Sequence, residues 1–215
     1  MKIGIIGGTF NPIHIAHLRI AEEVRDRLAL DRVVFMPAAA PPHKPLAGEL
    51  SFGHRYAMVE LAIADNPAFT VSDLEGKRGG TSYSIHTLTE LGQMHPEDEL
   101  FFIIGSDSFL EIASWYRYQE LFACCNMVVV ERPGGEIRDL AAALPAAVAG
   151  EFVPADSGRL DHRSGFSVHY LAGIPLAISS SAIRELAHTG HSLRYLVSDA
   201  VARYITEQRI YADVR

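Results

Sequence analysis

The stretch KIGIIGGTFNPIHIAHLRIAEE, residues 2–23, decides the fold because a predicted strand and a predicted helix meet in it. Residues 2–6 form an apolar run of strand length, bounded by two glycines. Residues 15–30 repeat apolar side chains at helical spacing, with charged side chains on the remaining arc. Two interpretations of the turn between them stay open: a phosphate-binding turn with two working histidines, or an ordinary strand-to-helix connection.

The rest of the chain repeats this alternation. It indicates an α/β fold, a doubly wound parallel sheet with helices on both faces. Residues 179–215 are predicted to be a C-terminal helical subregion of a single domain, residues 1–215. Residues 150–177 are predicted to be irregular and to end in a strand, GIPLAI. Further strands are predicted at residues 32–37, 69–73, 100–105 and 126–135 (the last with its turn), and helices at 51–65, 82–95, 139–149, 179–190 and 198–211.

The composition is 48% hydrophobic and 21% charged, which is typical of a globular protein. The formal net charge of −7 argues against non-specific nucleic-acid binding, although a local cluster of cations can still bind a nucleotide. No apolar run approaches the length of a membrane span, and the first strand is too short for a secretory signal. Cys124 and Cys125 are interpreted as buried thiols. We therefore expect a cytoplasmic protein without nucleic-acid or membrane partners.

The unusual polar clusters of the sequence lie at the ends of predicted strands. Ligands of doubly wound sheets bind at the carboxyl ends of the strands, so we expect one shared site. His14 and His17 project from one face of the first helical turn, where imidazoles can donate to charge developing on a phosphoryl oxygen. The turn lacks the third glycine of G-x-G-x-x-G, and no Walker A sequence occurs. The clusters are residues 7–17, 41–44, 82–84, 105–107, 132 and 178–184.

The turn GGTFNPIHIAH, residues 7–17, resembles the G-x-F-[DN]-P-x-H-x-G-H signature of the nucleotidylyltransferase superfamily, with Ala16 where the family has glycine. Members of that superfamily transfer AMP or CMP from a nucleotide to a phosphate or a phosphorylated alcohol. Six further motifs follow in the order seen in bacterial nicotinate mononucleotide adenylyltransferases. The resemblance covers essentially the whole chain and implies a Rossmann-like fold with a small C-terminal helical tail. The motifs are PPHK (41–44), TSYSIHTL (81–88), IIGSDS (103–108), SWYRY (114–118), ERPG (131–134) and ISSSAIR (178–184).

The resemblance implies that the turn and two later motifs bind ATP. It assigns His14, His17 and Arg184 as catalytic residues that contact the triphosphate. It also implies that Asp107 accepts hydrogen bonds from ribose hydroxyls and that residues 178–184 form a pyrophosphate receptor. Without the family, helix caps and a surface arginine also account for these residues. The implied ATP-binding set is Gly7, Gly8, Thr9, Phe10, His14, His17, Gly105, Asp107, Ile178, Ser180, Ser181 and Arg184.

The resemblance implies a second set of residues for nicotinate mononucleotide. Trp115 would stack on the pyridine ring, and backbone N–H groups near Ser84 and Tyr116 would receive the carboxylate. His43 and Lys44 would contact phosphate. Without the family, a tryptophan is more often part of the core, and residues 41–44 fit a solvated loop. The implied set is Asn11, His43, Lys44, Ser82, Tyr83, Ser84, Trp115, Tyr116 and Arg132.

The implied reaction needs no enzyme nucleophile, because the acceptor phosphate can attack the α-phosphorus of ATP in line. Mg²⁺ is expected to arrive with ATP, since no carboxylate cluster suggests a protein metal site. Alternative functions are a sister adenylyltransferase for nicotinamide mononucleotide or phosphopantetheine, and a non-catalytic nucleotide-binding module. A class I aminoacyl-tRNA synthetase fragment would need a KMSKS-like loop, which is absent. The oligomeric state is left open, a homo-oligomer included.

Overall fold

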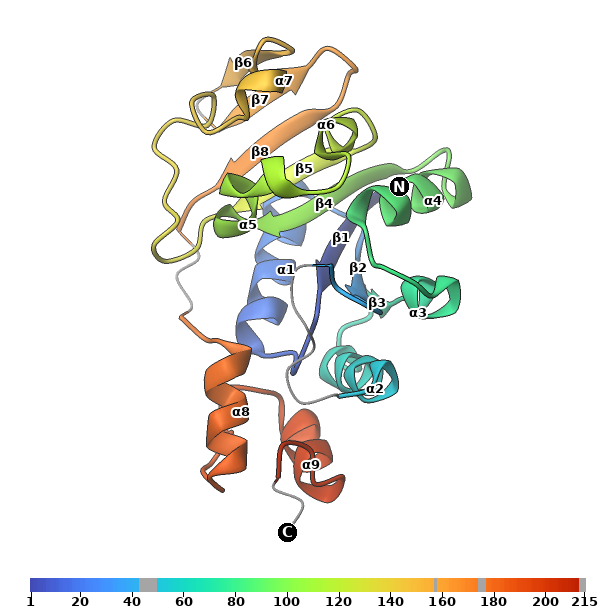
Figure 1. Ribbon diagram of the computed structural model, residues 1–215, viewed down its shortest axis with the longest axis vertical. Helices are drawn as coiled ribbons and strands as arrows, with labels where there is room; N and C mark the ends of the chain where they lie inside the picture. The colour runs from blue at the N-terminus through green and yellow to red at the C-terminus, as the bar shows by residue number, and fades with distance from the viewer. Residues whose placement is uncertain (43–49, 157, 174–176, 213–215) are drawn as a thin grey trace.

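The computed structural model describes residues 1–42, 50–156, 158–173 and 177–212. In this part of the chain, eight strands form one sheet with the order β3-β2-β1-β4-β5-β8-β7-β6 (Figure 1). The strands are β1 (Lys2–Gly8), β2 (Arg32–Pro37), β3 (Phe69–Val71), β4 (Glu99–Gly105), β5 (Asn126–Val130), β6 (Phe152–Asp156), β7 (Arg159–His162) and β8 (Ser167–Leu171).

The described helices lie on both faces of the sheet. Their bounds are α1 (Ile15–Leu28), α2 (Phe52–Ile63), α3 (Leu74–Arg78), α4 (Ser84–Met94), α5 (Ser106–Leu110), the 3₁₀ helix η1 (Ile112–Ser114), α6 (Tyr118–Leu121), α7 (Ala146–Ala149), α8 (Ser180–His188) and α9 (Asp199–Glu207).

Strand β1 lies inside the sheet, paired in parallel with β2 on one side and β4 on the other. Its apolar side chains alternate between two cores. Ile6 packs with α1, α2 and α9, whereas Ile3 and Ile5 pack with α4, α5 and α6. A strand buried on both faces explains why residues 2–6 read as a continuous apolar run. The predicted doubly wound sheet is confirmed.

Successive strands are placed on opposite sides of β1. The chain first continues to β2 and β3 on one side, and then returns to β4, β5 and β8 on the other. The connections on the two sides therefore diverge between β1 and β4. In open α/β sheets such a switch point leaves a crevice at the carboxyl ends of the strands, where ligands bind.

Residues 150–171 correct one prediction. Instead of irregular structure, they form β6, β7 and β8, and β7 is antiparallel to both of its neighbours. The sheet is therefore mixed rather than wholly parallel. The sequence does not indicate β6, because it is an exposed edge strand that contains Pro154 and has no buried apolar alternation. Of the predicted strand GIPLAI, residues 174–176 lie outside the described part, and residues 173, 177 and 178 are not in a strand.

The Ala-rich stretch 139–149 is also corrected, because only the four-residue α7 forms within it. The Asp139 carboxylate accepts hydrogen bonds from the backbone N–H groups of Ala141 and Ala142, which holds a turn there. Pro145 directly precedes α7, and proline cannot donate a backbone hydrogen bond inside a continuous helix.

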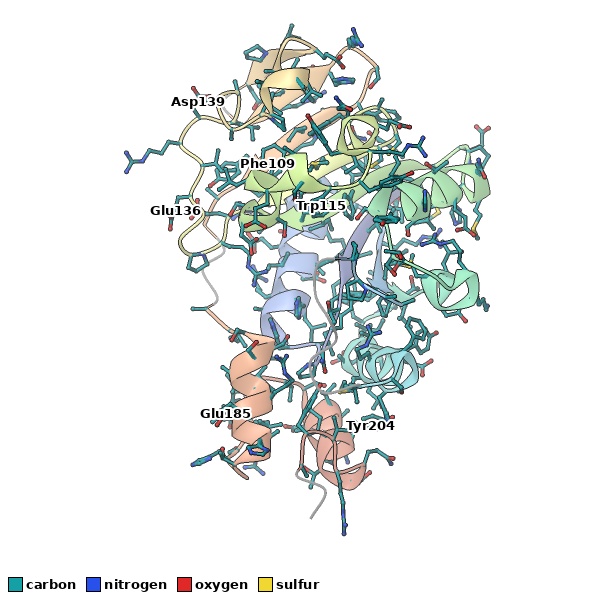
Figure 2. All side chains as sticks on the ribbon, viewed as in Figure 1. Phe109, Trp115, Glu136, Asp139, Glu185 and Tyr204 are labelled. Carbon is teal, nitrogen blue, oxygen red and sulfur yellow. The ribbon has the colours of Figure 1, made fainter. Side chains whose placement is uncertain are left out.

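The two C-terminal helices lie at the opposite end of the molecule from β6 and β7 (Figure 1). Val201 and Ile205 of α9 are buried in the same core as α1 and α2. Tyr204, labelled in Figure 2, hydrogen-bonds through its hydroxyl to His54 Nδ1 of α2 at 2.9 Å. The predicted C-terminal helical tail is confirmed, and the single domain over residues 1–215 stays a prediction.

Two glycines give a paired test of this packing. A methyl group at Gly4 would lie 2.9 Å from Leu30 Cδ1 and 3.2 Å from Val33 Cγ2, whereas one at Gly92 in α4 would meet open space. We expect Gly4→Ala to lower the free energy of unfolding by about 1 to 3 kcal/mol. Gly92→Ala should raise it by about 0.5 to 1 kcal/mol, because alanine loses less entropy in a helix. Urea denaturation measures both, and a Gly4→Ala protein as stable as wild type would contradict the described packing.

Candidate active site

A cleft of about 660 Å³ opens at the carboxyl ends of β1, β4 and β5, where the sheet has its switch point. Of the ATP-binding set predicted from the sequence, the structure brings all but Ile178 to this cleft. Ile178 packs against the apolar core instead. Two residues predicted for the acceptor, Asn11 and Arg132, also line the cleft. The predicted residues lining it are Gly7, Gly8, Thr9, Phe10, Asn11, His14, His17, Gly105, Asp107, Arg132, Ser180, Ser181 and Arg184.

The two histidines of the first turn pack against each other. His14 is buried, with 3% of its surface exposed, and its ring stacks on that of His17 with 3.7 Å between centroids. The His14 backbone N–H donates a hydrogen bond to His17 Nδ1 at 3.2 Å. Because Nδ1 accepts this bond, a neutral His17 ring carries its proton on Nε2. His17 can therefore offer one N–H donor to a ligand in the cleft.

Burial controls the charge of both rings. Burial, together with the smaller effect of the nearby positive charge of Arg132, lowers the pKa of His14 to about 4. Burial also lowers the pKa of His17 well below its usual value, with smaller contributions from His14 and Arg132. Both imidazoles are consequently neutral at neutral pH, so they act as hydrogen-bond donors rather than as cations.

Helix α8 brings positive charge to the other side of the cleft. Arg184 donates from Nη1 to the Asn11 carbonyl at 2.8 Å and from Nη2 to Ser181 Oγ at 3.1 Å. Ser180 Oγ donates to the Pro12 carbonyl at 2.9 Å. These hydrogen bonds hold the first turn of α8 against the turn that follows β1. The N-terminal N–H groups of α8 and the guanidinium form an arrangement that suits the phosphates of a nucleotide.

A hydrogen bond connects the loops that follow β4 and β5 at the cleft. The Arg132 backbone N–H donates to the buried Ser106 Oγ at 2.9 Å. A methyl group at Gly105 would collide with Asp107 Oδ1 and lie 2.6 Å from Arg132 Cδ, so a larger residue there would displace these two side chains from the strand end. The exposed carboxylate of Asp107 lines the cleft and can accept hydrogen bonds from a pair of vicinal hydroxyls.

A second, smaller pocket of about 110 Å³ is lined by Pro42, Ser82, Tyr83, Ser84, Trp115 and Tyr116. Ser84 is the first residue of α4, so backbone N–H groups without helical partners lie at this pocket. Trp115 (Figure 2) is half-buried and packs edge-on against Phe102 of β4, so it belongs to the core as well as to the pocket. Tyr116 packs on Tyr83 with 4.5 Å between ring centroids.

The small pocket suits a flat aromatic ring that bears a carboxylate. Its walls are aromatic, and its polar end is a helix start that favours a negative charge. Of the acceptor set, Ser82, Tyr83, Ser84, Trp115 and Tyr116 meet here, whereas Asn11 and Arg132 lie in the larger cleft. His43 and Lys44 lie outside the described residues.

Sequence reasoning missed two residues that hold the turn after β1. Tyr211 donates from its hydroxyl to Asn11 Oδ1 at 2.5 Å. Arg55 donates from Nη1 to the Thr9 carbonyl at 2.8 Å. A signal for Arg55 was present, because it shares the buried face of α2 with Met58 and Val59. Tyr211 gave no such signal, since its contact depends on how the C-terminal segment folds back.

The described residues contain no group of three or more His, Cys, Asp or Glu side chains arranged to hold a metal ion. Asp107 provides the one carboxylate among the described residues that line the cleft. In the same described part, no helix is long and apolar enough to cross a membrane.

The chain belongs to the cytidylyltransferase-like family, whose model matches residues 5–186. Within it, the chain is 66% identical to a Geobacter metallireducens protein, over the full length of both chains, and 64% identical to a Geobacter sulfurreducens protein, over 99% of each. Both of these relatives are named "Probable nicotinate-nucleotide adenylyltransferase". The family that the sequence motifs indicated is therefore confirmed.

Solved structures show the same fold. Plasmodium falciparum nicotinic acid mononucleotide adenylyltransferase complexed with NaAD superposes with a TM-score of 0.75 at 20% identity, covering 98% of this chain and 97% of that one. The same enzyme complexed with APC gives a TM-score of 0.74 at 19% identity, covering 98% and 96%. The Rossmann-like fold predicted from the sequence is thereby confirmed.

The depressed pKa of His14 predicts a pH dependence of stability. Its folded-state pKa of about 4 lies below the unfolded value of 6.5, so the unfolded chain binds the proton more tightly. Stability should therefore fall as the pH drops from 6.5 to 4, and His14 should account for about 3 kcal/mol of that loss. The measurement is urea denaturation across this range for wild type and His14→Asn. The loss should be smaller in the variant, and parallel curves would contradict the assignment.

Proposed function

We propose that this chain transfers AMP from ATP to nicotinate mononucleotide, giving deamido-NAD and pyrophosphate, in NAD biosynthesis. One observation carries the proposal: two pockets of different chemistry open at the same edge of the sheet. The larger cleft has two neutral imidazoles, two guanidinium groups and a helix start, which suit a triphosphate. The smaller pocket has the aromatic walls and free helix N–H groups that suit a nicotinate ring. The names of the full-length relatives support the same activity.

The reaction is a direct displacement at phosphorus. An oxygen of the acceptor 5′-phosphate forms a bond to the α-phosphorus of ATP, and the bond from that phosphorus to the α–β bridging oxygen breaks. The bonding electrons leave with pyrophosphate. The chain supplies alignment of the two substrates and stabilisation of charge on the equatorial oxygens.

Individual residues take separate parts in this step. His17 Nε2–H donates to an α-phosphate oxygen, and the neighbouring His14 keeps that ring oriented through stacking and its backbone N–H. Arg184 and the start of α8 hold the β- and γ-phosphates, with Ser181 beside the guanidinium. Asp107 accepts hydrogen bonds from the adenosine ribose.

Enzymes of the nucleotidyltransferase family generally use a divalent metal ion with ATP. We propose Mg²⁺ for this chain. The single carboxylate among the described cleft residues fits an ion that is carried by the triphosphate rather than by a protein site. When bound, the ion shields negative charge on the departing pyrophosphate.

The acceptor distinguishes this proposal from the sister activities. Phosphopantetheine has no aromatic ring, so the pocket around Trp115 would have no use for it, and nicotinamide lacks the carboxylate that favours the start of α4. The hydrogen-bonded geometry of both histidines and Arg184 also argues for chemistry rather than nucleotide binding alone. A cytoplasmic location and a homo-oligomeric state stay predictions.

An acceptor panel tests the function. Pyrophosphate release is measured with ATP, Mg²⁺ and, in turn, nicotinate mononucleotide, nicotinamide mononucleotide and phosphopantetheine. We expect the highest kcat/KM with nicotinate mononucleotide, by about tenfold or more. Replacing its carboxylate by an amide removes the charged acceptor from the N–H groups at the start of α4, which costs more than about 1 kcal/mol of binding free energy. A preference for the amide would overturn the choice of acceptor, and no turnover with any acceptor would overturn the activity.

The matched control for the panel is Trp115→Leu. This change removes the ring platform of the small pocket without touching the larger cleft. The KM for nicotinate mononucleotide should rise while the KM for ATP stays near its wild-type value. Equal changes in both constants would contradict a separate acceptor pocket.

A further inference from the structure

Arg55 is a buried cation that forms no direct ion pair within the described residues. It lies in the first turns of α2, its side chain is 0% exposed, and it is the largest fully buried side chain among the described residues. It makes no ion pair with a carboxylate of the described part, and burial lowers its pKa against smaller, opposing effects of Tyr211 and Glu75. Its Nε atom is buried without a hydrogen-bond partner in that same part. Burying such a group costs several kcal/mol, so its presence calls for an explanation.

The guanidinium connects two loops that follow neighbouring strands. Nη1 donates to the Thr9 carbonyl after β1 at 2.8 Å, and Nη2 donates to the Ala39 carbonyl after β2 at 3.3 Å. The guanidinium also lies over the Phe52 ring, with its carbon 5.6 Å from the ring centroid. The planar fork of arginine can hold two acceptors at once, which a lysine ammonium on its flexible stem cannot do in the same geometry.

The Thr9 contact orients the turn that lines the larger cleft. In a trans peptide the C=O and the following N–H point in opposite directions. With the Thr9 carbonyl held by Arg55, the N–H of Phe10 is directed away from Arg55. Phe10 lines the cleft, and its left-handed backbone conformation, with φ of 48°, is one that a non-glycine residue adopts only when its surroundings impose it.

The Ala39 contact leads to the smaller pocket. The next residue, Ala40, donates its N–H to Ser82 Oγ at 3.1 Å, and its carbonyl accepts from the Ser82 N–H at 2.9 Å. Ser82 lines the small pocket next to Tyr83 and Ser84. A continuous chain of hydrogen bonds therefore runs from the turn of the larger cleft, through Arg55, to the wall of the small pocket.

We propose that Arg55 is a positioning residue that sets the placement of the ATP cleft relative to the acceptor pocket. The proposal rests on the function proposed above, since an in-line attack requires the reacting atoms of the two substrates to be held aligned at about 3 to 3.5 Å. Arg55 lines neither pocket, and it acts through the backbone of Thr9 and Ala39. Its loss should leave each pocket able to bind its own ligand while misaligning the reacting atoms.

The test compares two variants. Arg55→Lys keeps the positive charge but loses the planar fork of donors, and Arg55→Met keeps an unbranched side chain but loses both the charge and the donors. We expect kcat to fall about tenfold or more in both variants. The Kd of a non-hydrolysable ATP analogue, measured by calorimetry, should change by less than about threefold. Unfolding midpoints should stay within about 5 °C of wild type. Arg25→Lys is the matched control, because Arg25 bonds Glu22 within α1 and contacts neither loop, and its kcat should be unchanged.

Amide hydrogen exchange provides a readout independent of turnover. Exchange at residues 8–10 and 39–40 should rise together in Arg55→Lys and stay at wild-type rates in Arg25→Lys. If wild type shows no turnover with nicotinate mononucleotide while this exchange rises, the proposed function fails and the positioning role stands. A kcat of Arg55→Lys near the wild-type value, unchanged exchange in these segments, or a loss of activity that only follows unfolding in both variants would overturn the role of Arg55.

Discussion

The hydrogen bonds that fix the backbone of residues 8–14 are the constraint on which the site depends. This turn is held from three directions by groups that are remote in sequence. Arg184 and Ser180 of α8 hold its carbonyls from one side, Arg55 of α2 holds it from another, and Tyr211 reaches it from the C-terminal segment. Because the anchors come from α2, α8 and the C-terminal segment, the shape of the turn depends on how all three pack against it.

The site reconciles an acidic protein with an anionic ligand. The formal net charge is −7, yet the cleft has two guanidinium groups and the start of a helix. The histidines add no charge, because burial keeps both rings neutral at neutral pH. Their contribution is directional, through an Nε2–H donor whose orientation is set by stacking and by the His14 backbone N–H. Such fixed donors need no reorganisation as charge develops.

Much of this could be predicted from the sequence, for a physical reason. Residues that follow parallel strands end up at one edge of the sheet, so the order of strands along the chain is enough to bring His17 and Asp107 together. Arg184 differs, because the strand predicted before it is absent at its described positions, and its place in the site was implied by the family motif alone. The antiparallel strands over 150–171 could not be predicted, because an exposed edge strand has little apolar patterning. The role of Arg55 could not be predicted either, since its partners are backbone carbonyls, which sequence motifs do not encode.

The central claim is that the acceptor attacks ATP directly, with no covalent adenylyl intermediate on either histidine. The stereochemical course of the reaction tests this most directly, using ATP made chiral at the α-phosphorus by a sulfur substitution. A single in-line displacement predicts inversion of configuration in the phosphorothioate product. Retention of configuration would require two displacements and would contradict the account, since His14 or His17 would then have to act as a nucleophile.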